Sequence, residues 1–94
     1  MPATNEFQLP ESLTIVQAQS LHDQFEQLVE QESCEQIVLR ADTVERTDTA
    51  GLQLLLALVL AAKDRQINLV WDRPSAGLLA GASTLGLRQA LGLH

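Results

Sequence analysis

The chain predicts a single α/β domain, because segments with strand and helix periodicity alternate along its 94 residues. A length of 94 residues suits one domain, and 46% of them are hydrophobic, which is enough for a core. With only two Phe and one Trp, that core must consist mainly of aliphatic side chains. The alternation also predicts parallel neighbouring strands joined by right-handed crossovers. No internal repeat or linker divides the chain, so we expect one domain over residues 1–94.

The N-terminal third predicts a strand followed by an amphipathic helix. Apolar residues at even separations are typical of a half-buried strand, and here they are Phe7, Leu9, Leu13 and Ile15. Pro10 interrupts this pattern and indicates a bend or a sheet edge. Only six residues precede Phe7, so we expect the edge strand to be short or missing, and an open edge could pair with a second chain. Residues 17–32 form the predicted helix, with helical spacing of Ala18, Leu21, Phe25, Leu28 and Val29.

The rest of the chain continues the alternation. A short β-branched run over residues 36–41 predicts a buried strand, and a polar connection follows over residues 42–48. Residues 50–64 predict the second helix and residues 67–71 the next strand. Ser75 can cap a third helix that extends to residue 83, and Gly86 separates it from a final helical turn over residues 87–91.

The second helix is apolar on nearly every side. At 100° per residue its predicted core face consists of Gly51, Leu52, Leu55, Leu58, Val59 and Ala62. Opposite this face lie Gln53, Ala57 and Leu60, and Leu54 lies at its flank. A solvated helix face is normally polar, so two interpretations stay open: another element covers this side, or it is a docking patch.

Composition and charge restrict the functional classes. The net charge is −6, and the six basic residues form no run, which argues against nucleic acid and against an anionic membrane surface. The single cysteine, Cys34, cannot form an internal disulfide and fits a reducing compartment. The longest apolar stretch is shorter than the ~20 residues that cross a bilayer, and the N-terminus does not resemble a signal peptide. We therefore expect a cytoplasmic protein without membrane insertion.

Recognisable catalytic and cofactor motifs are missing from the sequence. No histidine or cysteine pair has metal-ligand spacing, and His22 falls on the polar side of the first helix. No glycine-rich phosphate cradle is present, and no Ser or Thr has an obvious activating base. The acids Asp42, Glu45 and Asp48 favour a solvated acidic loop over an ion site. We expect no catalytic residues, no cofactor and no metal.

The most informative segment is Thr47-Asp48-Thr49-Ala50-Gly51-Leu52, where a strand-end loop should turn into a helix N-terminus. In one interpretation, Asp48 or Thr49 simply caps the helix by accepting a bond from a backbone N–H. In the other, the position is functional, because free N–H groups and the helix dipole favour negative charge there. Phosphorylation of Thr49 would then change the local charge and hydrogen bonding.

This organisation resembles the STAS domain, a family that includes the bacterial anti-sigma factor antagonists. The resemblance is strongest over residues 13–93 and combines an Ile-Val-Leu strand, a short polar loop, the Asp-Thr-Ala-Gly-Leu segment and an aliphatic helix. It implies a small mixed β-sheet with helices packed mainly on one face. It also implies a non-enzymatic protein that docks on partners and is often switched when a partner kinase phosphorylates the loop.

The resemblance assigns roles to individual residues of the loop. Asp48 matches the loop acid and Gly51 the loop glycine, with two hydroxyl positions between them in the antagonists. Thr49 occupies the first and is the candidate phosphorylation site, whereas Ala50 replaces the usual phosphoserine. With the aliphatic side of the second helix, the expected partner-binding set comprises Asp48, Thr49, Ala50, Gly51, Gln53, Leu54, Ala57 and Leu60.

We therefore expect a regulatory module that acts by protein–protein docking, as in bacterial signalling or chemotaxis clusters, on an anti-sigma or kinase-like regulator or another signalling protein. The alternative is the STAS subunit of a phospholipid-transport ABC system, which docks on the ATPase. An alternative of another class is a small phosphoryl-accepting or hydrolytic enzyme. A homodimer is a further option for the apolar side of the second helix.

Overall fold

The computed structural model describes residues 4–31 and 34–93. A three-stranded parallel sheet has the order β1-β3-β5, formed by Thr4–Gln8, Gln36–Arg40 and Asn68–Asp72. β1 pairs with β3 over five residues, from Thr4 opposite Gln36 to Gln8 opposite Arg40, and β5 pairs with β3 over the same length. β1 therefore forms one edge of this sheet and β5 the other.

A second, two-stranded sheet lies beside the first one. It consists of β2 (Ser12–Leu13) and β4 (Arg46–Thr47), which also run parallel. Pro10 falls between β1 and β2, so the bend that it indicated is confirmed, but the single strand predicted through Ile15 was wrong. Every strand pair among the described residues is parallel, as the alternation predicted, so no antiparallel pair of a mixed sheet occurs in these ranges.

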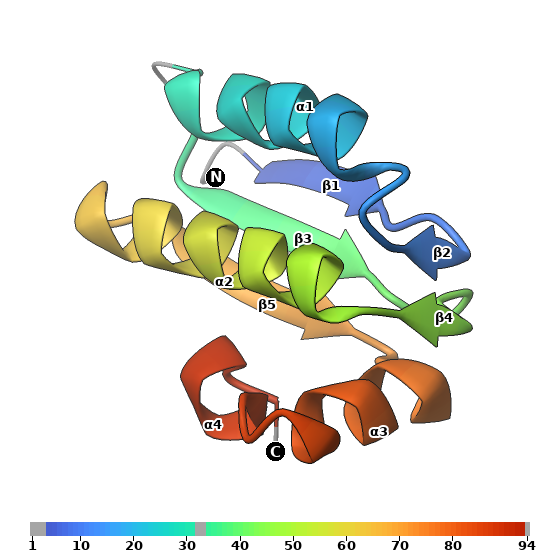
Figure 1. The fold of residues 1–94 in the computed structure, drawn as a ribbon. Helices are drawn as coiled ribbons and strands as arrows, with labels where there is room; N and C mark the ends of the chain where they lie inside the picture. Colours follow the sequence, from blue (N-terminus) through green and yellow to red (C-terminus); the bar gives the residue numbers. More distant parts are fainter. Residues whose placement is uncertain (1–3, 32–33, 94) are drawn as a thin grey trace.

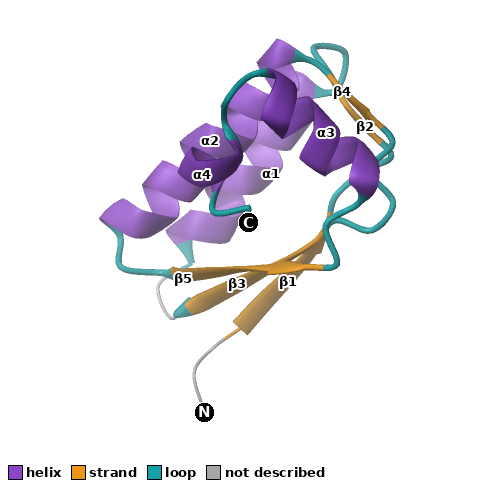
Figure 2. Cartoon of the chain, turned by 90° about the horizontal axis from the view of Figure 1, so that it is seen from below, coloured by secondary structure: helices purple, strands orange, loops and turns teal. Residues whose placement is uncertain are grey.

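The helices pack on one face of the three-stranded sheet, as Figure 2 shows. α1 (Ala18–Glu30) and α2 (Thr49–Asp64) lie side by side across the strands, and α3 (Ala76–Thr84) and α4 (Arg88–Leu91) follow β5 (Figure 1). The α/β class with helices on one face is therefore confirmed. Predicted and observed helix ends agree within two residues, except that the predicted end of the first helix at Glu32 lies outside the described residues.

The core lies between the sheet and the helices. β3 contributes Ile37 and Leu39, both fully buried, and α2 contributes Leu52, Leu55 and Leu58 from its predicted core face. Phe7 of β1 meets Phe25 of α1 edge to face, with ring centroids 5.5 Å apart. In α2 the predicted core residue Val59 is only half-buried, whereas Gly51 and Ala62 are buried as expected.

Within residues 4–31 and 34–93 no helix covers the other face of the main sheet, which is mostly polar but carries Val38 and Val70. Arg40 on β3 donates to both carboxylate oxygens of Glu6 on β1, each at 3.1 Å. The alternation along β3 leaves Val38 on this face and sends Ile37 and Leu39 into the core. In the described ranges, no helix is long and apolar enough to cross a membrane.

Candidate functional site

Asp48 joins the start of α2 to the loop that leads into α1. It is the N-cap residue of α2, and its Oδ1 accepts a hydrogen bond from the Gly51 N–H at 2.8 Å. Its Oδ2 accepts a second bond from the Ile15 N–H at 2.9 Å, and the Asp48 N–H donates to the Leu13 carbonyl. The capping interpretation is therefore confirmed for Asp48, which in addition fixes a neighbouring loop.

These bonds also set the protonation of Asp48. The N–H groups of Gly51 and then Ile15 stabilise the carboxylate and lower the pKa of Asp48 below its ordinary value, although partial desolvation acts in the opposite direction. Asp48 is therefore a carboxylate at neutral pH. A negative charge already occupies the N-terminal end of the α2 dipole, where it is favoured.

Gly51 allows the start of α2 to approach β2. Its predicted place on the core face is confirmed, because Gly51 is buried and a Cβ there would overlap with the carbonyl of Leu13. Gly51 is buried and cannot contact a partner directly. It can affect binding only through the position that it gives to the start of α2. Ala50 beside it is half-buried.

Thr49 is the exposed residue of the signature loop. It is the first residue of α2, and no hydrogen-bond partner for its hydroxyl occurs in the part of the chain that the structure describes. Gln53, one turn further along, is exposed as well. A hydroxyl without a structural partner at a helix N-terminus is open to contact or to modification.

Two apolar side chains beside Thr49 were missed by the sequence reasoning. Ile15 and Val16 expose 67% and 83% of their surface, in the loop that Asp48 holds against α2. The even spacing of Leu13 and Ile15 had indicated a buried strand position for Ile15, and this was wrong. We call the surface formed by Ile15, Val16, Thr49 and Gln53 the loop surface.

The apolar patch expected on α2 divides into two parts. Leu60 lies on the outer face and exposes 55% of its surface, and the outer-face residues Gln53 and Ala57 are exposed too. No element among the described residues covers this face, so the two-sided core is excluded for the isolated chain. Leu54 lines a groove between α1 and α2, and Ala57 lines it as well, so Ala57 lies where the outer face meets the groove.

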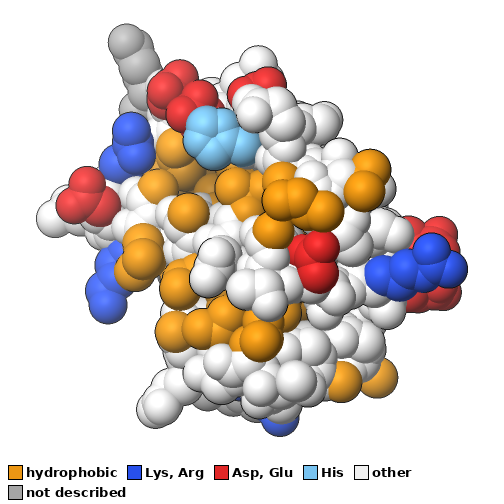
Figure 3. Space-filling model, in the orientation of Figure 1, with side chains coloured by type: hydrophobic (Ala, Val, Ile, Leu, Met, Phe, Trp, Pro, Cys, Tyr) orange, Lys and Arg blue, Asp and Glu red, His pale blue; other side chains and the backbone are white. Residues whose placement is uncertain are grey.

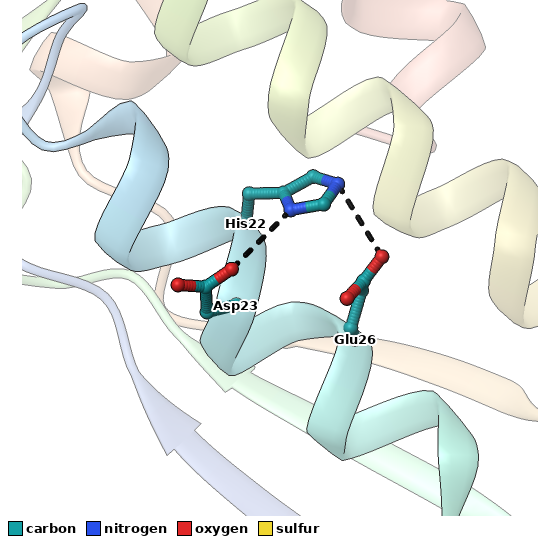
Figure 4. Close-up of side chains that lie close together, drawn as sticks. All are labelled: His22, Asp23 and Glu26. Carbon is teal, nitrogen blue, oxygen red and sulfur yellow. Dashed lines mark ion pairs between the residues drawn. The ribbon is translucent and has the colours of Figure 1, made fainter.

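One group of side chains has the composition of a metal site. His22, Asp23 and Glu26 of α1 offer ligand atoms that all lie within 4.8 Å of one another (Figure 4). The His22 ring lies between the two acids, with Nδ1 3.7 Å from Asp23 and Nε2 3.5 Å from Glu26. All three side chains are exposed and belong to one helix, an arrangement that is common without an ion, so we do not assign a metal site.

The remaining polar residues do not converge on a reaction centre. In the ranges 4–31 and 34–93, no polar or charged residue is buried. Asp42, Glu45 and Asp48 are not grouped as metal ligands there, and Cys34 is half-buried near the end of α1. The chemistry that the described residues support best is surface contact with another molecule.

Comparisons with known proteins agree with this architecture. A family model described as "Mlab, STAS domain" matches residues 3–93, nearly the whole chain. A sulfate transporter family protein from Wolinella succinogenes has a similar fold, with a TM-score of 0.76 and 18% sequence identity. The similarity covers 95% of this chain and 71% of that one. No curated protein sequence matches this chain.

Proposed function

Because this chain belongs to the STAS-domain family, we propose that it is a non-enzymatic regulatory module that docks on a protein partner through the loop surface. The observation that supports this most is the exposure of Ile15 and Val16 in the loop that is bonded to Asp48, the residue before Thr49, whose hydroxyl has no partner among the described residues. Asp48 bonds the backbone of Ile15 to the start of α2, and preorganised contacts cost less entropy on binding. STAS domains generally interact with other proteins.

We further propose that Leu60 on the outer face of α2 extends this surface, and that the cytoplasm is where docking takes place. Asp48, Ala50 and Gly51 contribute indirectly, because they position the helix start. In the antagonist-like version, the partner is an anti-sigma or kinase-like regulator or another signalling protein, and phosphorylation of Thr49 reverses the docking. The new charge would face the Asp48 carboxylate, and like charges in close proximity repel.

One observation favours the alternative of constitutive docking. The second hydroxyl position of the loop is Ala50, which is half-buried and cannot accept a phosphate. A loop that binds without phosphorylation is expected in a permanently bound subunit, such as the STAS subunit of a phospholipid-transport ABC system bound to its ATPase. In that version, Thr49 serves as an unmodified contact.

Binding measurements with purified candidate partners test both versions. The candidates are any kinase-like regulators or ATPases found in the gene neighbourhood of this protein, with affinity measured by calorimetry. We expect Val16→Asp and Thr49→Glu to weaken binding at least about tenfold, which is about 1.4 kcal/mol, without lowering the melting temperature. Thr84→Glu, the same change at an exposed threonine at the end of α3, is the matched control.

The outcome with Thr49→Ala separates the two versions. A phosphorylation switch predicts that the alanine variant binds but no longer responds to the kinase, and a constitutive contact predicts weaker binding without any kinase. Unchanged affinity for Val16→Asp, Thr49→Glu and Thr49→Ala would exclude the loop surface as the docking site. Turnover of phosphate or acyl esters by the purified protein would instead support the enzymatic alternative.

A further inference from the structure

A groove with an apolar floor runs between α1 and α2. Its volume is about 220 Å³, and its apolar lining consists of Phe25, Val29, Leu54, Ala57, Leu58 and Ala61. Phe25, Val29 and Leu58 are buried and form the floor, whereas Leu54 and Ala61 are half-buried and Ala57 is exposed. Figure 3 shows hydrophobic side chains gathered on this face over the two helices. This position is on the α1 side of α2, and Leu60 is not among the residues that line it.

The wall formed by α1 is acidic. Glu26 and Glu30 line the groove directly, and Asp23 lies beside His22 at its rim. α1 contains no lysine or arginine from Ala18 to Glu30, and His22 is the residue of this helix that lies within ion-pair distance of two of the three carboxylates, Asp23 and Glu26. Among the described residues, the one Lys or Arg that lines the groove is Arg65, which follows the end of α2. Electrostatic complementarity therefore favours a positively charged occupant.

The groove is long enough for a short helix. A second depression of about 350 Å³ continues it beyond α1 and shares Val29, Glu30 and Arg65 with the first. From His22 to Gln31 the helix rises about 13 Å, which is about two and a half turns. An amphipathic helix of this length presents apolar side chains at i, i+3 or i+4, and i+7 along one face, the spacing of helices that bind in grooves.

We propose that this groove binds an amphipathic helix of a protein partner, with an apolar face flanked by lysines or arginines. The apolar face packs on Leu54, Ala57 and Ala61, and the basic flank pairs with Glu26 and Glu30. A second copy of the chain does not fit this description. Among the described helices, α1 and α3 carry no lysine or arginine, α2 has only Lys63, and the four-residue α4 has only Arg88.

This inference rests on the proposed function in one respect, namely that the protein works by binding other proteins. It assigns a second contact, formed by residues of α1 and α2 that do not belong to the loop surface. The Coulomb attraction between exposed charges is modest and is screened by salt, so the apolar floor must supply most of the affinity and the acidic wall the specificity. Binding should therefore weaken, but not vanish, as the salt concentration rises.

A synthetic peptide probe tests the groove without knowledge of the natural partner. The probe has about 14 residues, with leucines at i, i+3, i+4 and i+7 and lysines on both flanks. Binding is followed by fluorescence anisotropy of the labelled peptide and by amide NMR shifts of the whole protein. We expect shifts concentrated on α1 and α2 along the groove, and at least about tenfold weaker binding of a peptide with glutamates in place of the lysines.

Two sets of variants locate the site. Ala57→Arg adds bulk and positive charge in the groove at an exposed position, and should weaken the lysine peptide at least about tenfold. Ala80→Arg, the same change at an exposed position of α3, is the matched control and should bind normally. The double variant Glu26→Lys, Glu30→Lys should reverse the preference, so that the glutamate peptide binds better than the lysine peptide.

Several results would overturn the proposal. The first is an unchanged affinity of the Ala57→Arg variant for the lysine peptide, when this variant still unfolds cooperatively. The others are NMR shifts outside the groove and equal binding of the lysine and glutamate peptides. If Ala57→Arg does not fold, the charge reversal in Glu26→Lys, Glu30→Lys still decides. If the protein sediments with phosphatidylglycerol vesicles but does not bind the peptide, the groove contacts a membrane surface, and the proposal of a helical protein partner is excluded. Val16→Asp should leave peptide binding intact, so failure of the loop surface is distinguishable from failure of the groove.

Discussion

Asp48 performs two structural tasks with one carboxylate. Oδ1 accepts a bond within its own helix start, from Gly51, and Oδ2 accepts a bond across the fold, from Ile15. Because both acceptors belong to one rigid group, the orientation of α2 is coupled to the position of the loop that carries Val16. The same bonds lower the pKa of Asp48, so its protonation couples the loop surface to pH.

Replacement of Asp48 by Asn should change the pH dependence of stability. The folded-state pKa of Asp48 is depressed, so its charge contributes stability above the unfolded value of about 3.9, and this contribution is lost as pH falls through the folded-state pKa. We expect wild type to be more stable than Asp48→Asn at pH 7, with the difference shrinking below about pH 4. Urea unfolding at several pH values measures this, with Glu11→Gln in the neighbouring loop as control. A constant difference over this range would contradict the prediction.

Gly51 sets how close α2 comes to β2. Because a Cβ at this position would meet the backbone carbonyl of Leu13, not a flexible side chain, the helix start must shift to accept it. Gly51→Ala should therefore destabilise by about 1–3 kcal/mol despite the better helix propensity of alanine. Thermal or urea unfolding checks this, and Gln53→Ala, an exposed position of the same helix, should be near neutral. Equal stability of Gly51→Ala and wild type would mean that the approach to Leu13 is unimportant.

At the scale of elements, the two-stranded sheet acts as a support for the loop surface. α2 approaches β2 from one side through Gly51, and α3 approaches the β4 segment through Gly77 and Gly81. A Cβ on Gly77 would lie 3.0 Å from the Glu45 carbonyl oxygen, and a Cβ on Gly81 would overlap with the Thr47 hydroxyl. The Ser75 hydroxyl adds a donated bond to the Val44 carbonyl. Gly51, Gly77 and Gly81 therefore all allow a helix to approach the two-stranded sheet and the residues next to it.

Thr47 and Gly81 should be energetically coupled. Gly81→Ala improves helix propensity but forces the Thr47 side chain to move, so we expect it to destabilise the wild type. On a Thr47→Ala background the hydroxyl is gone, and the same change should cost less. A double-mutant cycle by urea unfolding should give a coupling of about 0.5–3 kcal/mol between these neighbours. If the effects of the two substitutions on the free energy of unfolding are additive, α3 does not pack tightly against Thr47. Ala80→Gly, at an exposed position of α3, is the control for helix propensity alone.

The helices and strands could be predicted where the hydrophobic periodicity is strong, but not where an element has only two residues and no clear pattern. Residues 36–41 and 50–64 follow the strand and helix patterns closely, and the structure places β3 and α2 within one residue of them. The connection over residues 42–48 looked uniformly polar, yet it contains β4 and the buried Val44. A two-residue strand has no period to detect, and its pairing with Ser12–Leu13 is a tertiary contact.

At the scale of the whole molecule, the candidate site was predictable in composition but not in extent. The Asp-Thr-Ala-Gly loop could be located because capping chemistry and helix polarity act locally. Ile15 and Val16 could not, because their exposure depends on a bond to Asp48, which is 33 residues away from Ile15. The groove between α1 and α2 likewise exists only after both helices have packed on the sheet. Local chemistry is thus encoded in short motifs, whereas surfaces arise from the packing of distant segments.

The outer face of α2 should control association of the whole molecule. Leu60 is 55% exposed on a helix face that no described element covers, so Leu60→Asp should leave the cooperative melt unchanged and abolish any self-association seen by sedimentation velocity. Each copy carries a formal charge of −6, so a dimer held by apolar contact should tighten as salt screens the repulsion. Binding of a basic helix in the groove should instead weaken as the salt concentration rises. Leu85→Asp, a change at another exposed leucine, is the control.

Two results for Leu60→Asp would contradict this prediction. If the variant unfolds, the outer face of α2 is covered in solution. If it stays folded and neither self-association nor partner binding weakens, Leu60 is an exposed leucine without a docking role.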